Sequence, residues 1–174
     1  MNNILCDIDR LTMEGFSEKE AIEMKSKEQT NFFNKYGFLF HIVLPSENRL
    51  FFNAHTHGLP DKYNHPDIEI LIPLEETLQD TKEWISHILN TLIDRIEYGH
   101  ILTDGEKLKG YIKGMYCETI LINKKNGRKV FRFLMPDMNG YLPTDDKCDK
   151  KFKIALTQDM DEREYIINFR GGCY

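Results

Sequence analysis

The sequence lacks a run of apolar residues long enough to cross a membrane, and its first residues do not have the pattern of a signal peptide. Its first ten residues, MNNILCDIDR, carry acids where a signal peptide needs a basic start and a long apolar run. No stretch approaches the roughly 18 apolar residues that a membrane span requires. We therefore expect a cytoplasmic protein that does not associate with membranes.

Closely spaced cysteines are also missing. The four cysteines, Cys6, Cys117, Cys148 and Cys173, are far apart and form no Cys-x-x-Cys pair. This spacing disfavours a zinc site built on thiolates, and it is typical of reduced thiols in a cytoplasmic protein. An isolated cysteine in an apolar run, such as Cys117, is usually a core residue and not a nucleophile.

Recognised catalytic motifs are absent as well. There is no Gly-x-Ser-x-Gly elbow, no phosphate-binding P-loop and no Gly-x-Gly-x-x-Gly segment after a strand. The net charge of -5 disfavours non-specific binding to nucleic acid, because phosphate contacts need a surplus of Lys and Arg on one face. We expect no cofactor and no nucleic-acid partner, and we favour a protein that is not an enzyme.

What the chain does contain is the composition of a globular protein. Of its 174 residues, 41% are hydrophobic and 29% are charged, which is ordinary for a folded domain that buries a core. No repeat, low-complexity tract or linker rich in Pro, Gly or Ser divides the sequence. We therefore predict a single domain over residues 1–174.

The first part of the chain has the pattern of one helix followed by strands. Residues 17–20, SEKE, have the form of a capping box and predict a charged surface helix that continues to about Asn34. Three runs rich in β-formers follow, near residues 38–44, 50–57 and 68–72.

The strongest helix signal lies in the middle of the chain. Apolar residues recur at three- and four-residue steps across 78–96, and Gly99 is a natural stop, so we predict an amphipathic helix that packs on the sheet with His87 at its rim. Asn126 and Gly127, between two β-rich runs, predict a hairpin with a type I′ turn. The short runs FKIAL and YIINF near the end suggest edge strands. This order indicates an α+β fold with a mainly antiparallel sheet.

The stretch FNAHTHGLPDKYNHPD, residues 52–67, concentrates three histidines. In a strand, His55 and His57 point to the same face, about 6.5 to 7 Å apart along the chain, which is close enough to bind one metal ion. Further candidate ligands are the nitrogen of His65 and an oxygen of Asp61 or Asp67. Such a set would resemble a catalytic zinc site with three ligands and one open position.

The other interpretation of the same stretch is structural. His55 and His57 would then lie on the solvent face of a strand, with Phe52 and Ala54 toward the core, and His65 would hold its loop by a hydrogen bond to the backbone. A His-x-His pair alone is a weak signal, and further ligands at the spacing of known His-x-His enzymes are missing. We favour no metal.

Two segments, AHTHGLPDKYNHPDIEIL and FRFLMPDMNGYLP, resemble the bacterial family DUF4262, a domain of unknown function. Its members have an aromatic-Thr-x-Gly-Leu strand end, then Gly-His-Pro-Glu-Leu and an apolar strand, a helix, and finally Gln-x-x-Trp-Pro-Asp-x-x-Gly-x-x-Pro. Residues 55–59, 64–68 and 135–143 hold these positions, and the resemblance covers roughly residues 30–150. It implies no established activity. The family pattern has no histidine at 55 or 57, which again disfavours a metal there.

The resemblance also selects candidate site residues. The segment PDMNG is a turn, in which Asp137 can bond back to the backbone and Gly140 supplies a positive φ. We expect the 58–67 loop and the 135–143 turn to lie side by side, with His65 and Asp137 within about 12 Å of each other. The candidate pocket residues are His65, Asp67, Asp137 and Asn139.

Two classes of function fit the sequence. The first is a small intracellular bacterial binding or interaction module with a protein or small-molecule partner, for example an immunity protein whose net charge would steer a basic toxin. The second is a small metal-dependent hydrolase that uses residues 55–67. We favour the first, because the sequence offers a site but no complete reaction machinery.

Overall fold

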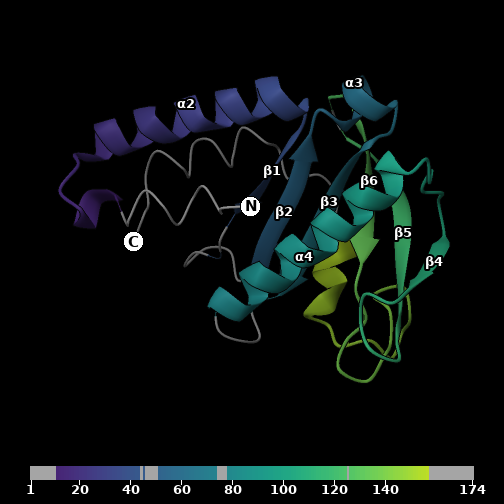
Figure 1. The fold of residues 1–174 in the computed structure, drawn as a ribbon. Helices are drawn as coiled ribbons and strands as arrows, with labels where there is room; N and C mark the ends of the chain where they lie inside the picture. The colour runs from purple at the N-terminus through teal and green to yellow at the C-terminus, as the bar shows by residue number, and fades with distance from the viewer. Residues whose placement is uncertain (1–10, 44, 46–50, 74–77, 125, 157–174) are drawn as a thin grey trace.

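The structure, a computed structural model, describes residues 11–43, 45, 51–73, 78–124 and 126–156 (Figure 1). Its helices and strands are α2 (Glu18–Tyr36), β1 (Leu39–Val43), β2 (Phe51–His57), α3 (Leu59–Tyr63), β3 (Asp67–Pro73), α4 (Leu78–Glu97), β4 (Glu106–Lys109), β5 (Tyr116–Asn123), β6 (Lys129–Leu134) and the short 3-10 helix η1 (Phe152–Leu156). The strands form one sheet in the order β1-β2-β3-β6-β5-β4. All neighbouring strands are antiparallel except β3 and β6, which are parallel. The predicted α+β class with a mainly antiparallel sheet is confirmed.

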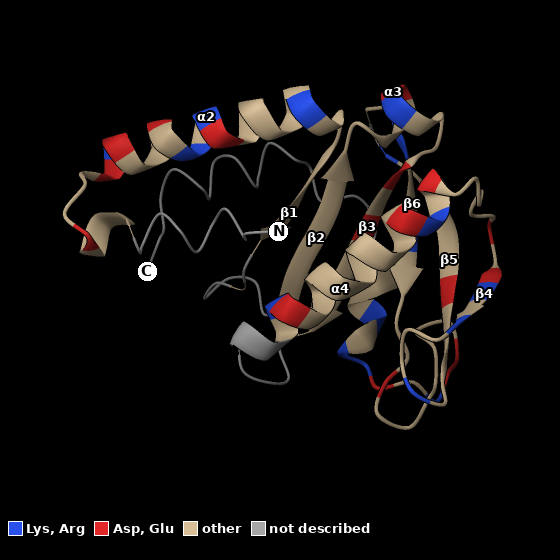
Figure 2. Ribbon diagram, viewed as in Figure 1, with Lys and Arg blue, Asp and Glu red and all other residues tan. Residues whose placement is uncertain are grey.

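Helix α2 begins and ends where its local sequence predicts. The backbone N–H of Glu20 donates to Ser17 Oγ, and the Glu20 carboxylate accepts from the backbone N–H of Ser17 at 2.9 Å, so the capping box is present. Gly37 ends the helix in the left-handed conformation, with φ 73°. Both acidic and basic residues occur along the helix (Figure 2), and Ala21 and Lys25 are its buried residues. The charged surface helix is confirmed, and it extends two residues beyond Asn34.

The end of α2 packs against the loop that follows β2. Gly58 has φ 94°, and a Cβ atom built on it would lie 2.6 Å from the carbonyl oxygen of Gly37 and 2.8 Å from the Phe33 ring. Only glycine allows this close approach and this backbone conformation together. Gly58 therefore fixes the point at which the histidine-bearing strand β2 turns away from the sheet.

Helix α4 lies across one face of the sheet (Figure 1). Its apolar stripe is fully or almost fully buried and consists of Ile85, Ile88, Leu89, Leu92, Ile93 and Ile96. These side chains join one core with alternate residues of the strands, among them Phe52, Ile68, Ile70, Phe131 and Phe133. His87 is exposed, as predicted. The packing of the amphipathic helix on the sheet is confirmed.

The β5–β6 hairpin forms as predicted, but its turn is of a different type. Gly127 has φ 82°, whereas Asn64 is the one residue other than glycine with positive φ in the described part of the chain. Asn126 therefore lacks the conformation that a type I′ turn needs. Gly127 N–H donates to Lys124 O at 2.9 Å and Lys124 N–H donates to Arg128 O at 2.8 Å, which makes a longer loop with the glycine in the left-handed position.

The run FKIAL forms helix η1 and not the edge strand that its apolar residues suggest. Phe152 and Ala155 are buried, and a three-residue spacing places both on one side of a 3-10 helix. The run YIINF lies outside the described residues. In the described ranges, no helix is long and apolar enough to cross a membrane.

The sheet face opposite α4 divides into two halves. Near the end of β3 it is apolar, because Phe51, Leu71 and Leu134 pack against Ala155 of η1. Near the start of β3 the same face carries ionised and imidazole side chains.

Candidate functional site

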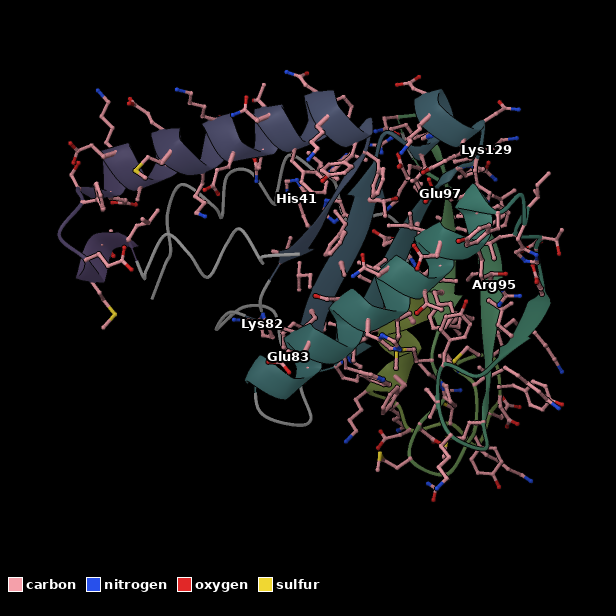
Figure 3. All side chains as sticks on the ribbon, viewed as in Figure 1. His41, Lys82, Glu83, Arg95, Glu97 and Lys129 are labelled. Atoms are coloured by element: carbon pink, nitrogen blue, oxygen red, sulfur yellow. The ribbon has the colours of Figure 1, made fainter. Side chains whose placement is uncertain are left out.

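Three histidines from two neighbouring strands lie together on the face opposite α4. The antiparallel register places His41 of β1 directly opposite His55 of β2, and His57, two residues later, points to the same face. The centroid of the His41 ring lies 5.6 Å from that of His55 and 5.1 Å from that of His57. The centroids of the His55 and His57 rings are 4.9 Å apart. Figure 3 labels His41 beside β1. We call these three residues the histidine cluster.

Burial disfavours the charged form of two imidazoles of the histidine cluster, His41 and His55. Burial, followed by the neighbouring His57, lowers the pKa of His41 to about 4. Burial, followed by the other two imidazoles, lowers the pKa of His55 well below its ordinary value. One possible ligand atom from each ring lies within 4.8 Å of the other two. The shared face of His55 and His57 agrees with the sequence prediction, but His41 was missed.

A buried ion pair lies next to the histidine cluster. The side chain of Arg132 donates from Nε and Nη2 to Glu69 Oε2, at 2.9 and 2.6 Å, and from Nη1 to the carbonyl oxygen of Ala155 at 3.0 Å. Lys124 Nζ donates to Glu69 Oε1 at 2.8 Å. Burial favours a raised pKa for Glu69, but Arg132 and then Lys124 outweigh it and hold the pKa below its ordinary value. Glu69 is therefore ionised although it is only 4% exposed.

Asn53 connects this ion pair to the histidine cluster. Its amide nitrogen faces Glu69 Oε1 at 3.5 Å, and its Oδ1 lies 3.0 Å from His55 Nδ1. An ionised carboxylate only accepts hydrogen bonds, so it assigns the amide nitrogen to the Glu69 side and the amide oxygen to the His55 side. His55 Nδ1 then donates to Asn53, so that Nε2 is the unprotonated ring nitrogen in this tautomer.

Asp67, a predicted pocket residue, uses its carboxylate to hold neighbouring parts of the fold together. Its Oδ1 accepts from Thr56 Oγ1 at 3.0 Å and from the Leu59 backbone N–H at 3.2 Å, while Oδ2 accepts from Arg128 Nη2 at 2.9 Å. The space left between Asp67 and the neighbouring groups is about 10 Å³, enough for about one water molecule. Asp67 thus holds the loop after β2 to the sheet, and this region has no room for an organic ligand.

His65, a predicted pocket residue and metal candidate, is held by backbone groups on the other side of the sheet. Its Nδ1 donates to the carbonyl oxygen of Pro66 at 2.6 Å, and its Nε2 accepts from the backbone N–H of Leu102 at 3.2 Å. The ring lies 5.4 Å from that of Phe131, a residue of the α4-face core. Burial is the main cause that lowers its pKa. His65 therefore does not join His55 and His57, and its backbone hydrogen bond agrees with the structural interpretation.

The turn around Asp137 also has the geometry that its sequence predicts. Asp137 Oδ1 accepts from the backbone N–H groups of Asn139 and Tyr141, at 2.9 and 3.0 Å, and Oδ2 accepts from that of Asp149 at 2.9 Å. Gly140 has φ 86°. Burial favours a raised pKa for Asp137, but these backbone donors outweigh it and lower the pKa. Asn139 is exposed and contributes its backbone to this turn.

The structure does not bring His65 and Asp137 together. Strands β3 and β6 are parallel, with Asp67 opposite Val130 and Ile70 opposite Phe133. His65 precedes β3 and Asp137 follows β6, so the two lie near opposite ends of the seven residues of β3, roughly 20 Å apart along the strand. The prediction of one shared polar pocket is wrong, because parallel pairing separates a segment that precedes one strand from a segment that follows the other.

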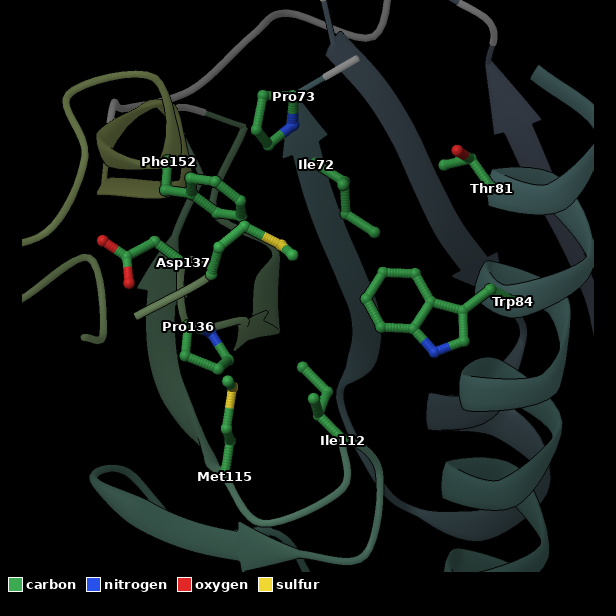
Figure 4. Close-up of a pocket in the computed structure, with 10 residues that line it drawn as sticks. Ile72, Pro73, Thr81, Trp84, Ile112, Met115, Pro136, Asp137 and Phe152 are labelled. Atoms are coloured by element: carbon green, nitrogen blue, oxygen red, sulfur yellow. The ribbon is translucent and has the colours of Figure 1, made fainter. Parts of the chain in front are cut away.

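A second site lies at the end of the sheet where β3 and β6 finish (Figure 4). It is a pocket of about 350 Å³, which we call the α4 pocket. Its lining consists of Ile72, Pro73, Thr81, Trp84, Ile112, Met115, Pro136, Asp137, Met138 and Phe152. Trp84 of α4 faces the strand ends across it, and the Asp137 carboxylate points away from the indole.

The two cysteines of the described chain do not suggest nucleophilic chemistry. Cys117 and Cys148 are free and buried. Burial raises the pKa of the Cys117 thiol to about 12, and burial is also the main cause that raises the pKa of Cys148. A thiol reacts as its thiolate, which is scarce at such a pKa. The expected core role of Cys117 is thus consistent with its position.

Comparisons of the chain with protein-family models, with curated proteins and with solved structures find no significant match.

Proposed function

We propose that this protein is a small binding module that takes an uncharged, largely apolar small molecule in the α4 pocket. The observation that carries the proposal is the pocket itself, about 350 Å³ in volume and lined mainly by apolar side chains. Ligand sites in proteins are typically concave and apolar, with a few polar groups that orient the ligand. A volume near the lower end of the usual range of about 300 to 1,000 Å³ suits a molecule with one or two rings.

The lining supports an uncharged ligand. Trp84 and Phe152 offer aromatic surfaces, and Met115 offers a polarizable sulfur that packs well on aromatic rings. The one charged side chain in the lining is Asp137, and both of its oxygens already accept hydrogen bonds from backbone N–H groups. It therefore offers little pairing to a cationic ligand, and its negative charge disfavours an anionic one.

The sequence pattern supports the same location. Pro136, Asp137 and Met138 line the α4 pocket, and they belong to the 135–143 segment that resembles the DUF4262 pattern. We also propose kinship with that bacterial family, which the motif segments support, and a cytoplasmic setting, which the wide spacing of the cysteines supports. Binding is favoured over catalysis because the lining contains no histidine, cysteine or lysine to act as a nucleophile or general base.

The single tryptophan of the chain makes the test direct. Trp84 is the only tryptophan in the sequence, so a 15N–1H correlation spectrum has one indole N–H signal, and that signal reports on the α4 pocket. We expect this signal to shift when the protein is titrated with uncharged one- and two-ring aromatic compounds. A panel in which no compound shifts it would contradict the proposal.

A pair of matched variants locates the binding. Ile112→Phe places a larger side chain in the α4 pocket and should weaken binding of the best compound about tenfold, a change of about 1.4 kcal/mol. Ile101→Phe makes the same exchange at a position that is 72% exposed and outside the lining, and it should leave binding unchanged. Equal affinity in both variants would place the ligand elsewhere.

A further inference from the structure

We propose that His41, His55 and His57 form a binding site for one divalent transition-metal ion, and that Zn2+ is the ion it takes. This site lies on the sheet face opposite α4, so it is independent of the α4 pocket and of the function proposed for that pocket. The sequence favoured no metal because the DUF4262 pattern lacks histidines at 55 and 57 and no further ligand has the spacing of known His-x-His enzymes. The pairing of β1 with β2 supplies that ligand as His41.

The backbone places the three imidazoles in a triangle. Directly opposite residues of an antiparallel pair have Cβ atoms about 4.5 to 5.5 Å apart, which applies to His41 and His55. Residues two apart in one strand are about 6.5 to 7 Å apart, which applies to His55 and His57. Two paired strands therefore suffice to build this ligand set, without any loop.

The side chains need only a small adjustment to bind an ion. One possible ligand atom from each ring already lies within 4.8 Å of the other two. In a tetrahedral zinc site with Zn–N distances of about 2.0 to 2.1 Å, the ligand nitrogens are about 3.3 Å apart. Rotation of the rings about their side-chain bonds can close this difference while the sheet stays fixed.

The ligand chemistry also favours a metal. An imidazole binds a metal ion through an unprotonated ring nitrogen, and all three side chains of the site offer such a nitrogen. Imidazole is a good ligand for zinc, copper and nickel, and three histidines leave a fourth position of a tetrahedral zinc ion open to water. Each of the three side chains is partly exposed, so an ion can reach them from solvent.

A second layer of hydrogen bonds orients one of the ligands. Metal-binding histidines usually donate their other ring N–H to a neighbouring acceptor, which fixes the tautomer and the ring orientation. His55 Nδ1 donates to Asn53 Oδ1 at 3.0 Å, and Asn53 is itself oriented by Glu69. His55 Nε2 is then the nitrogen that binds the ion. Asn53 is a positioning residue in this arrangement.

Ring packing alone is the competing explanation for the cluster. His41 and His55 are nearly parallel, with an interplanar angle of 18° and centroids 5.6 Å apart, and stacked imidazoles need no ion. The two explanations differ in one measurable respect, because only a metal site binds Zn2+ with a stoichiometry that depends on His41.

The test uses the full chain, purified without a histidine tag, freed of metal with a chelator and titrated with Zn2+ in a calorimeter. We expect one Zn2+ per chain and a loss of affinity of about 100-fold or more in His41→Ala, since even residues behind the ligands contribute about 10- to 100-fold. His87→Ala removes an exposed histidine of α4 and should bind like the wild type. Absence of saturable binding to the wild type, or equal affinity in His41→Ala, would overturn the proposal.

A measurement on the wild-type chain covers the case in which His41→Ala fails to fold. Long-range 1H–15N spectra of the imidazole rings should show Zn2+-dependent shifts at ring nitrogens of His41, His55 and His57, and no shift at His87. If the shifts fall on other histidines, the assignment of the site is wrong.

Discussion

The two faces of the sheet differ in how their side chains are buried. Against α4 the strands contribute apolar residues such as Ile68, Ile70 and Phe133, which are 0% exposed. On the other face the same strands contribute Glu69 and Arg132, which are 4% and 1% exposed. Burial of apolar side chains stabilises a fold directly, whereas burial of an ion pair costs a desolvation penalty that its attraction often only offsets.

The difference bears on the metal site proposed for the face opposite α4. Stability alone would favour apolar side chains, such as those that the strands turn toward α4. The opposite face keeps ionised groups out of water and uses them to orient Asn53 and, through it, His55. These hydrogen bonds support the metal site proposed for His41, His55 and His57.

Breaking the buried ion pair should have the largest effect. Arg132→Ala leaves the carboxylate of Glu69 buried with one of its two cationic partners gone. We expect a loss of about 3 to 5 kcal/mol in the free energy of unfolding, because removing one partner from a buried ion pair leaves a charge that is only partly compensated. Urea denaturation of the variant and the wild type measures this difference.

Arg128→Ala is the matched control for that variant. Arg128 also pairs with an acid at 2.9 Å, namely Asp67, but its side chain is 35% exposed, against 1% for Arg132. Water can replace part of its interaction, so we expect a loss of about 1 kcal/mol or less. Equal losses in the two variants would mean that burial does not set the cost.

Breaking the apolar face should have the next largest effect. Leu92 is 0% exposed in the core between α4 and the sheet. Leu92→Ala should lower the free energy of unfolding by about 3 kcal/mol, through lost apolar contact and the cavity left behind. His87→Ala, on the exposed side of the same helix, should change it by no more than about 0.5 kcal/mol. A loss below about 1 kcal/mol in Leu92→Ala would mean that α4 is not packed as described.

The features that could be predicted from sequence are those that depend on local pattern. The stripe of α4, the capping box at Ser17 and the alternation that places His55 and His57 on one face all follow from periods of 3.6 and 2 residues. The position of His41 opposite His55 depends on the register of two strands, which neither strand encodes alone. The wrong prediction that His65 and Asp137 lie close together has the same origin. Whether β3 and β6 pair in parallel or antiparallel is decided by the whole sheet.

The Arg132–Glu69 pair was missed for a related reason. In sequence, Arg132 is one basic residue inside an apolar strand, 63 positions from Glu69. Only the alignment of β3 with β6, which sets Glu69 opposite Arg132, reveals the pair. A charged residue within a buried strand is nevertheless a usable signal, because such a charge needs a partner from another strand.

Apart from the control variants, the smallest expected effect is that of replacing His65, whose ring bonds to backbone groups and lies apart from the histidine cluster. Its neutral ring donates to Pro66 and accepts from the N–H of Leu102, so His65→Ala leaves that buried N–H without its acceptor and opens a small cavity. We expect a loss of about 2 kcal/mol at pH 7. Burial lowers the pKa of His65 in the folded protein, so its contribution is fully present above the ordinary histidine pKa of about 6.5 and is lost as the pH falls from there toward the folded pKa. Urea denaturation between pH 7.5 and pH 5 measures this: the difference between the wild type and His65→Ala should shrink as the pH falls, and a difference that stays constant would show that Leu102 does not require the neutral ring.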